Sequence, residues 1–167
     1  ALALCSIDAV YSLRGDWRRM LDAQRRGREL LAGTLASDSI IYCDLLSGSA
    51  VNWCQLGRYQ ECIQDVQAAL TIRQRIGDPF LASEFRRLGY AYGLQGQYEE
   101  ASSFFAQAFE NHGEVFKQGD AGTLRLQAEI WLLQGRTSEA EHIIRESLEL
   151  NEKRGANRFL IEGYYIL

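Results

Sequence analysis

The sequence is poor in the residues that interrupt helices or build metal sites. It contains a single proline among 167 residues and only two histidines, His112 and His142. Proline breaks helix interiors, so its scarcity permits long uninterrupted helices. No stretch approaches the roughly 18 consecutive apolar residues that would suggest a membrane span, and no basic-then-apolar signal segment opens the chain. These absences favour a helical protein without a membrane partner.

The four cysteines form no C-x-x-C pair, and both histidines are distant from them in sequence. This spacing argues against a zinc site. We interpret Cys5, Cys43, Cys54 and Cys62 as reduced thiols that fill small apolar sites of a cytoplasmic protein. The alternative, oxidation sensing by one exposed thiol, has no further support in the sequence.

The chain also lacks the motifs of common enzymes, with no G-x-S-x-G, no Walker lysine in a glycine loop and no H-E-x-x-H. Its formal net charge is −4 and its pI is about 5.3, whereas a nucleic-acid surface needs a dense basic footprint. A composition of 47% hydrophobic and 24% charged residues is typical of a globular protein. We therefore expect no enzyme activity, no cofactor, no metal and no direct contact with nucleic acid.

A short glycine-containing pattern recurs along the chain. It reads Gly15-Asp16-Trp17, Gly57-Arg58-Tyr59, Gly96-Gln97-Tyr98 and Gly135-Arg136-Thr137, with glycine spacings of 42, 39 and 39 residues. Apolar residues with helical spacing precede and follow the glycines. A glycine at a helix end adopts a left-handed backbone that needs no Cβ. Each copy is therefore predicted to be two antiparallel helices that bury their apolar faces against the next copy.

The third copy carries the fullest pattern. Its key positions are Phe85, Leu88, Gly89, Tyr92, Gly96, Tyr98, Ala101, Phe105 and Ala108. A large residue, Leu-Gly, an aromatic, Gly-x-Tyr and alanines on the second helix resemble the tetratricopeptide repeat. The resemblance implies an all-α fold, an α-solenoid in which antiparallel helical hairpins form a right-handed superhelix. A single array is expected over residues 1–167, with repeats at 1–42, 43–81, 82–120 and 121–159 and the start of a fifth at 160–167.

The period is longer than the usual 34 residues. Long-period arrays of this kind resemble the repeat regions of large bacterial signalling ATPases and transcriptional regulators, although eukaryotic arrays that hold cargo or polarity proteins also fit. The apolar spacing typical of a helix is already present at Leu4 and is still present at Leu167. We therefore expect a piece of a longer chain whose open apolar end, at Tyr164, Ile166 and Leu167, stays exposed or mediates self-association.

In the tetratricopeptide family the first helix of each hairpin lines a concave groove that binds partners. Matching positions in three copies predict the groove residues Asp44, Ser47, Val51, Gln55, Arg86, Tyr90, Arg125 and Glu129. Arg86 and Arg125 are one repeat apart and should lie side by side, where guanidinium groups bind carboxylate or phosphate. The competing interpretation is that Arg125 pairs with Glu129 four residues later on the same helix.

Six arginines between Arg14 and Arg28 form the densest charge cluster. They either dock an acidic surface or form ion pairs along one exposed helix face. The pairs expected in the second case are Arg18–Asp22, Asp22–Arg26 and Arg25–Glu29.

Taken together, the sequence predicts a protein- or peptide-binding scaffold within a larger bacterial regulatory protein. Two alternatives stay open. The array is a structural spacer that transmits conformational change between domains, or it senses a small effector in a pocket lined by Tyr90, Arg86 and Trp53.

Overall fold

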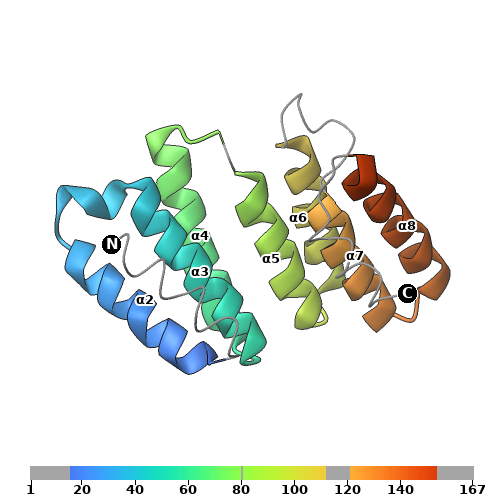
Figure 1. Ribbon diagram of the computed structural model, residues 1–167, viewed down its shortest axis with the longest axis horizontal. Helices are drawn as coiled ribbons and strands as arrows, with labels where there is room; N and C mark the ends of the chain where they lie inside the picture. The colour runs from blue at the N-terminus through green and yellow to red at the C-terminus, as the bar shows by residue number, and fades with distance from the viewer. Residues whose placement is uncertain (1–15, 80, 112–120, 154–167) are drawn as a thin grey trace.

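A computed structural model describes residues 16–79, 81–111 and 121–153 (Figure 1). Within these residues every regular element is a helix, which confirms the predicted all-α fold. The elements are α2 (Trp17–Leu31), the short 3-10 helix η1 (Leu35–Asp38), α3 (Ile40–Gln55), α4 (Tyr59–Ile76), α5 (Ala82–Leu94), α6 (Tyr98–Glu110), α7 (Ala121–Leu133) and α8 (Thr137–Lys153).

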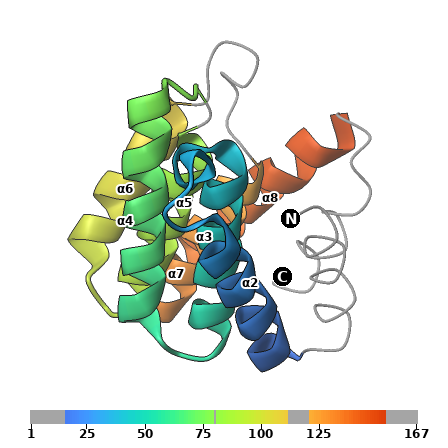
Figure 2. The same cartoon turned by 90° about the vertical axis from the view of Figure 1, so that its left-hand side faces the viewer.

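Consecutive helices pair as hairpins, α3 with α4, α5 with α6 and α7 with α8, and α2 packs on α3. The hairpins follow one another in a row along the long axis (Figure 1). Seen from the end, α4 and α6 form an outer layer, and α3, α5 and α7 lie in a second layer beside them (Figure 2). The described part of the chain is therefore the expected α-solenoid of antiparallel hairpins.

Each hairpin turn is closed by the glycine that the repeat pattern identified. Gly57, Gly96 and Gly135 have φ angles of 71°, 79° and 74°, in the left-handed region that glycine enters without a Cβ penalty. At the first of these turns the Arg58 amide donates to the carbonyl of Trp53 over 2.9 Å. The equivalent bond recurs at the other two turns, so the same backbone motif ends α3, α5 and α7.

Small residues allow the helices to approach one another closely. A Cβ added to Gly89 would lie 3.0 Å from the Phe105 ring and 3.1 Å from the Ala101 carbonyl oxygen. A Cβ on Gly93 would lie 2.6 Å from the Ile130 side chain on α7. The contact at Gly93 is shorter than real Cβ atoms make, and those at Gly89 are tighter than most. These two glycines therefore set the spacing between two hairpins and within one.

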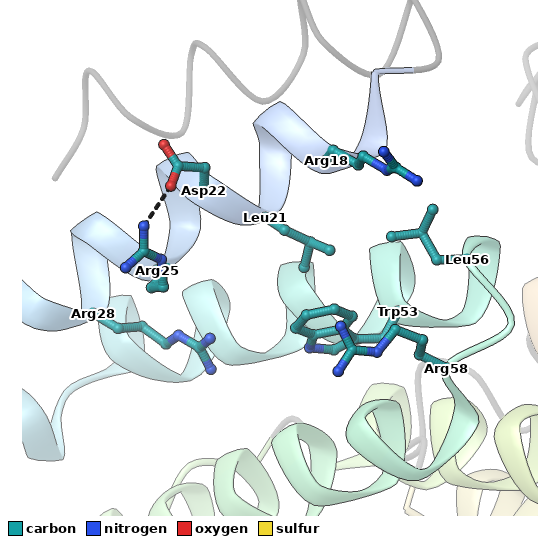
Figure 3. A pocket seen from close by; sticks show the side chains of 8 residues that line it. All are labelled: Arg18, Leu21, Asp22, Arg25, Arg28, Trp53, Leu56 and Arg58. Atoms are coloured by element: carbon teal, nitrogen blue, oxygen red, sulfur yellow. Dashed lines mark hydrogen bonds and ion pairs between the residues drawn. The ribbon is translucent and has the colours of Figure 1, made fainter.

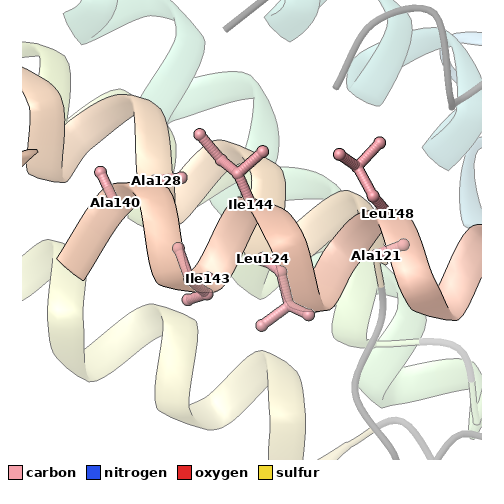
Figure 4. Close-up of a cluster of buried hydrophobic side chains, with 7 residues drawn as sticks. All are labelled: Ala121, Leu124, Ala128, Ala140, Ile143, Ile144 and Leu148. Atoms are coloured by element: carbon pink, nitrogen blue, oxygen red, sulfur yellow. The ribbon is translucent and has the colours of Figure 1, made fainter. Parts of the chain in front are cut away.

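Apolar side chains fill the space between the paired helices. Figure 4 shows the cluster between α7 and α8, which consists of Ala121, Leu124, Ala128, Ala140, Ile143, Ile144 and Leu148. A similar cluster lies between α3 and α4. Two further clusters join neighbouring hairpins, one across α3, α4 and α5 and the other across α6 and α7. The core is therefore a continuous series of small clusters along the array, as expected for a repeat protein.

Several sequence predictions fall outside the described residues. They include the first helix of the first copy, Cys5, His112 and the apolar end at Tyr164, Ile166 and Leu167. Among the described helices, none has the length and apolar character needed to cross a membrane.

Candidate partner-binding surfaces

The first helices of the three described hairpins form one continuous surface, because α5 contacts both α3 and α7. All eight predicted groove residues lie on these helices, and we call their surface the α3–α5–α7 face. With a pitch of 39 residues, Val51, Tyr90 and Glu129 occupy equivalent positions on neighbouring helices. The structure brings two of them close together, so that the Glu129 carboxylate acts on the pKa of the Tyr90 hydroxyl.

Arg125, Glu129 and Tyr90 form a partly buried polar network across α5 and α7. The Arg125 guanidinium pairs with the Glu129 carboxylate, and the two side chains are 27% and 25% exposed. Burial, followed by the nearby charge of Glu129, raises the pKa of Tyr90 above its ordinary value. The i,i+4 pair considered from the sequence is therefore formed, and any partner of Arg125 must compete with Glu129.

The more open part of the α3–α5–α7 face is apolar and neutral. Val51 is 44% exposed, and Gln55 one turn later is also exposed. Leu133, the equivalent of Gln55 on α7, is 60% exposed. Arg86 is half-buried on α5 between them. The face thus combines two arginines at equivalent positions with apolar side chains that reach solvent.

Ser47 does not line an open groove, and the structure corrects this expectation. Its side chain is buried, and its hydroxyl donates to both Glu84 carboxylate oxygens over 2.8 and 2.9 Å. Asp44, one turn earlier, is exposed but pairs with the buried Arg73 over 2.6 Å. Both residues turn toward α4 and α5 because these helices offer charged partners there.

Those partners belong to a buried ionic cluster made by Arg73, Asp78 and Glu84, together with Asp44, Ser47 and Arg87. Glu84 is fully buried on α5 and accepts hydrogen bonds from Arg73 Nε at 3.1 Å and Arg87 Nη1 at 3.3 Å. Arg73 on α4 also pairs with the buried Asp78. Burial opposes the charge of Arg73, but its hydrogen bond to Asp78 and the surrounding carboxylates raise its pKa. The cluster joins α3, α4 and α5, and so links two successive hairpins.

A pocket of about 540 Å³ lies where α2 crosses the end of α3 and the turn to α4 (Figure 3). Its lining residues are Arg18, Leu21, Asp22, Arg25, Arg28, Trp53, Leu56 and Arg58. The Arg58 guanidinium lies 4.3 Å above the Trp53 ring, a stabilising cation–π geometry. Asp65 on α4 accepts from Trp53 Nε1 at 2.9 Å and pairs with Arg28 at 2.8 Å. The aromatic side chain and several of the cations that line the pocket are therefore held in place by contacts with their neighbours.

Comparison with known proteins finds one family model that is similar to part of the chain. The family model described as tetratricopeptide repeat matches residues 42–114. Over these residues, the chain is similar to the tetratricopeptide repeat family. None of the curated proteins is similar enough in sequence to count as a match.

Solved structures with the same fold align with nearly the whole chain. Two crystal structures of a Podosopora anserina putative kinesin light chain with nearly identical TPR-like repeats, one of them a single-residue variant, each have a TM-score of 0.69 and 15% identity. Each alignment covers 98% of this chain, and 84% and 85% of theirs. The aspartyl phosphate phosphatase F of Bacillus subtilis has a TM-score of 0.76 and 19% identity, over 98% of this chain but only 43% of that protein. At such identities the likeness establishes the fold alone.

The described arginines of the cluster on α2 mostly form the expected ion pairs. Arg26 pairs with Asp22 at 3.0 Å, and Arg25 pairs with Glu29 at 3.2 Å. The predicted Arg18–Asp22 pair is replaced by Arg25–Asp22 at 2.6 Å, whose hydrogen bond lowers the pKa of Asp22. These pairs are exposed and add little stability.

Sequence reasoning missed the role of Trp53. It identified this residue as a neighbour of Tyr90 and Arg86 in an effector pocket. In the structure Trp53 points toward α4 and α2, and the pocket that it lines does not include Tyr90 or Arg86. The arginine that follows Gly57 was the available signal, because Arg136 follows Gly135 in the same way and lies 4.5 Å above the Trp131 ring.

Two of the cysteines fill buried sites as expected. Cys43 and Cys62 are 0% and 1% exposed, whereas Cys54 is partly exposed. His142 is exposed. In the described ranges of the chain, no three His, Cys, Asp or Glu side chains gather in a way that could hold a metal ion.

Proposed function

We propose that this tetratricopeptide array is a scaffold that binds a protein or peptide segment bearing a carboxylate, and that the α3–α5–α7 face is the binding surface. One observation carries the proposal. Arg86 and Arg125 stand at equivalent positions on two helices in contact, and apolar Val51 and Leu133 reach solvent on the same face. Paired guanidinium groups suit a carboxylate, and exposed apolar side chains suit the residues beside it.

The Arg125–Glu129 pair defines how such a partner would bind. A ligand carboxylate takes the place of Glu129 beside Arg125, and Arg86 on α5 supplies the second guanidinium. Since Glu129 is only partly buried, it can turn to solvent when displaced. Binding of this kind weakens with added salt, because exposed charges are screened.

The proposal also covers the larger protein to which the array belongs and its location in the cell. We place the array in the cytoplasmic, non-catalytic part of a larger bacterial protein that acts in signal transduction or transcription regulation. The 39-residue pitch and the arginine- and leucine-rich composition support this setting. A structural spacer between domains is the main alternative function. The bonds that Glu84 forms with Ser47 and Arg73 favour it for the α3 end of the face, because these side chains are already paired within the chain.

The decisive experiment selects binding peptides from a displayed random library and then measures their affinity by fluorescence anisotropy. Wild type is compared with Arg86→Glu/Arg125→Glu. The matched control is Arg26→Glu/Arg145→Glu, which makes the same change in net charge at side chains 69% and 64% exposed on α2 and α8. An Arg86→Gln/Arg125→Gln variant guards against misfolding, and circular dichroism verifies equal helicity.

We expect selected peptides to be rich in Asp or Glu. Their affinity should fall at least about tenfold in both face variants, which corresponds to about 1.4 kcal/mol, and should be unchanged in the control. An equal loss of affinity in the control would show that the net charge of the chain causes the effect, and it would contradict the proposal. Unchanged binding in the face variants would place the site elsewhere, with the Trp53 pocket as the next target. If no peptide is selected, the spacer function is favoured.

A further inference from the structure

Two cysteine thiols face each other across the turn that joins α3 to α4. Cys54 is the next-to-last residue of α3, and Cys62 lies at the start of α4. Their Sγ atoms are 2.8 Å apart. A disulfide bond is about 2.05 Å long, so the sulfurs need to approach by only about 0.8 Å to bond. This geometry is that of a dithiol close to disulfide formation.

The turn between the two cysteines is held firmly. Gly57 adopts a φ of 71°, and its amide donates to the Cys54 carbonyl over 3.0 Å. The Arg58 amide donates to the Trp53 carbonyl, and the Arg58 guanidinium covers the Trp53 ring. The short distance between the sulfurs is therefore set by an ordered turn.

Packing alone does not require sulfur at these two positions. In the next hairpin the equivalent residues, 39 positions later, are Gly93 and Ala101, and the same turn forms there. The two thiols also differ in access to solvent, because Cys54 is partly exposed whereas Cys62 is 1% exposed. A small oxidant can reach Cys54 first, with Cys62 directly behind it.

The electrostatics assign distinct roles to the pair. The hydrogen bond between the two thiols lowers the pKa of Cys54, although burial opposes this effect. The same interaction, together with burial, raises the pKa of Cys62. The thiolate is the reactive form of cysteine, so Cys54 is the attacking sulfur and Cys62 resolves the product.

We propose that Cys54 and Cys62 are a modification site, which a peroxide-class oxidant converts into a reversible intramolecular disulfide. The Cys54 thiolate attacks a peroxide oxygen, the O–O bond breaks, and the departing hydroxide takes up the proton that Cys54 released, giving water and Cys54 sulfenic acid. The Cys62 sulfur then attacks the Cys54 sulfur. The S–O bond breaks, and the hydroxide leaves as water with the Cys62 proton. Two thiols lose two electrons in total, and one peroxide becomes two water molecules.

Cys43 provides an internal control for this chemistry. It is fully buried on α3, and its thiol donates to the Ala69 carbonyl over 3.7 Å. Burial raises the pKa of Cys43. We expect this thiol to remain reduced while the pair reacts.

The test treats the folded wild-type chain with hydrogen peroxide, blocks free thiols with N-ethylmaleimide before unfolding, and digests the product with trypsin. Arg58 is the single basic residue between the two cysteines, so trypsin releases them on separate peptides, residues 29–58 and 59–73. A disulfide joins these peptides, at a mass two hydrogens below their sum, and dithiothreitol separates them. Because Cys43 shares the first peptide with Cys54, the Cys43→Ser variant assigns the link.

The proposal expects the joined peptide in the folded wild type and, in equal yield, in Cys43→Ser, with its loss in both Cys54→Ser and Cys62→Ser. Recovery of the two peptides separately after peroxide treatment, whether Cys54 is blocked or carries oxygen, would overturn it. So would a joined peptide that forms only when the chain is first unfolded in urea. The wild-type result decides the matter even if a serine variant fails to fold.

Discussion

The buried ionic cluster between α3, α4 and α5 yields the sharpest stability prediction. In the variant Arg73→Met, three carboxylates, Asp44, Asp78 and Glu84, lose their shared cation, and two of them are buried. Removing one partner of a buried ion pair costs about 3–5 kcal/mol, because an uncompensated charge stays in the interior. That is a large part of the 5–15 kcal/mol by which a typical protein is stable. We therefore expect Arg73→Met to lower the free energy of unfolding by about 3–5 kcal/mol.

The second copy of the repeat suggests how to test the cause. Leu45 occupies in α3 the position that Glu84 occupies in α5, and both side chains are buried. The double variant Arg73→Met/Glu84→Leu removes a charge of each sign. If the loss arises from an unpaired charge, the double variant should be more stable than Arg73→Met, since replacing both partners of a buried pair by apolar residues is often neutral or stabilising.

The assay is urea unfolding followed by circular dichroism, with unchanged slopes required before free energies are compared. Arg75→Met is the matched control. Arg75 is two residues away and pairs with Asp38, but the two side chains are 58% and 50% exposed, so its loss should cost less than about 1 kcal/mol. The reasoning is refuted if Arg73→Met costs no more than the control, or if adding Glu84→Leu recovers nothing.

Three further predictions concern the turns, the helix spacing and pH. Gly96→Ala should lower stability by about 1–2 kcal/mol, because an alanine cannot adopt a φ of 79° without strain; an unchanged urea midpoint would argue against it. Gly93→Ala should cost about 1–3 kcal/mol through overpacking against Ile130, and this cost should vanish in an Ile130→Ala background, as a double-mutant cycle would show. Burial and the charge of Glu129 raise the pKa of Tyr90 in the folded state above its ordinary value of 10.0. The unfolded chain then loses this proton first, so the Tyr90 contribution is complete below pH 10 and falls as pH rises further. Wild type should lose stability faster than Tyr90→Phe above that pH, and parallel pH profiles would contradict the assignment.

The hairpins and turns were predictable from the sequence because their signal is local and repeated. A glycine at a helix end requires a left-handed backbone wherever it occurs, so the spacing of Gly57, Gly96 and Gly135 located every described turn between paired helices. The pairing of Arg125 with Glu129 was also foreseeable, since residues four apart on a helix are neighbours.

The ionic cluster was not predictable in the same way. Each of its members is a polar residue on an amphipathic helix, which ordinarily indicates a solvated position. Glu84 is buried because α4 of the preceding hairpin supplies Arg73, eleven residues earlier but across a hairpin junction. The sequence held one unused signal, namely that the residues 39 positions before and after Glu84 are Leu45 and Thr123. Aligned copies would have marked this position as interior, and its acidic side chain would then have required a buried cation.

The ionic cluster also has a consequence for how this array can change over evolutionary time. Repeat arrays grow and shrink by duplicating or exchanging whole units, which succeeds when every junction is the same. Here the α5 hairpin carries the buried carboxylate of Glu84, which needs the hydrogen bonds that Arg73 and Ser47 of the preceding hairpin donate. Exchanging it for the α7 hairpin would place neutral Thr123 against Arg73, which would keep Asp44 and Asp78 but lose its fully buried partner Glu84. The order of these two units is thus fixed by chemistry, and recombination should be tolerated at other junctions before this one.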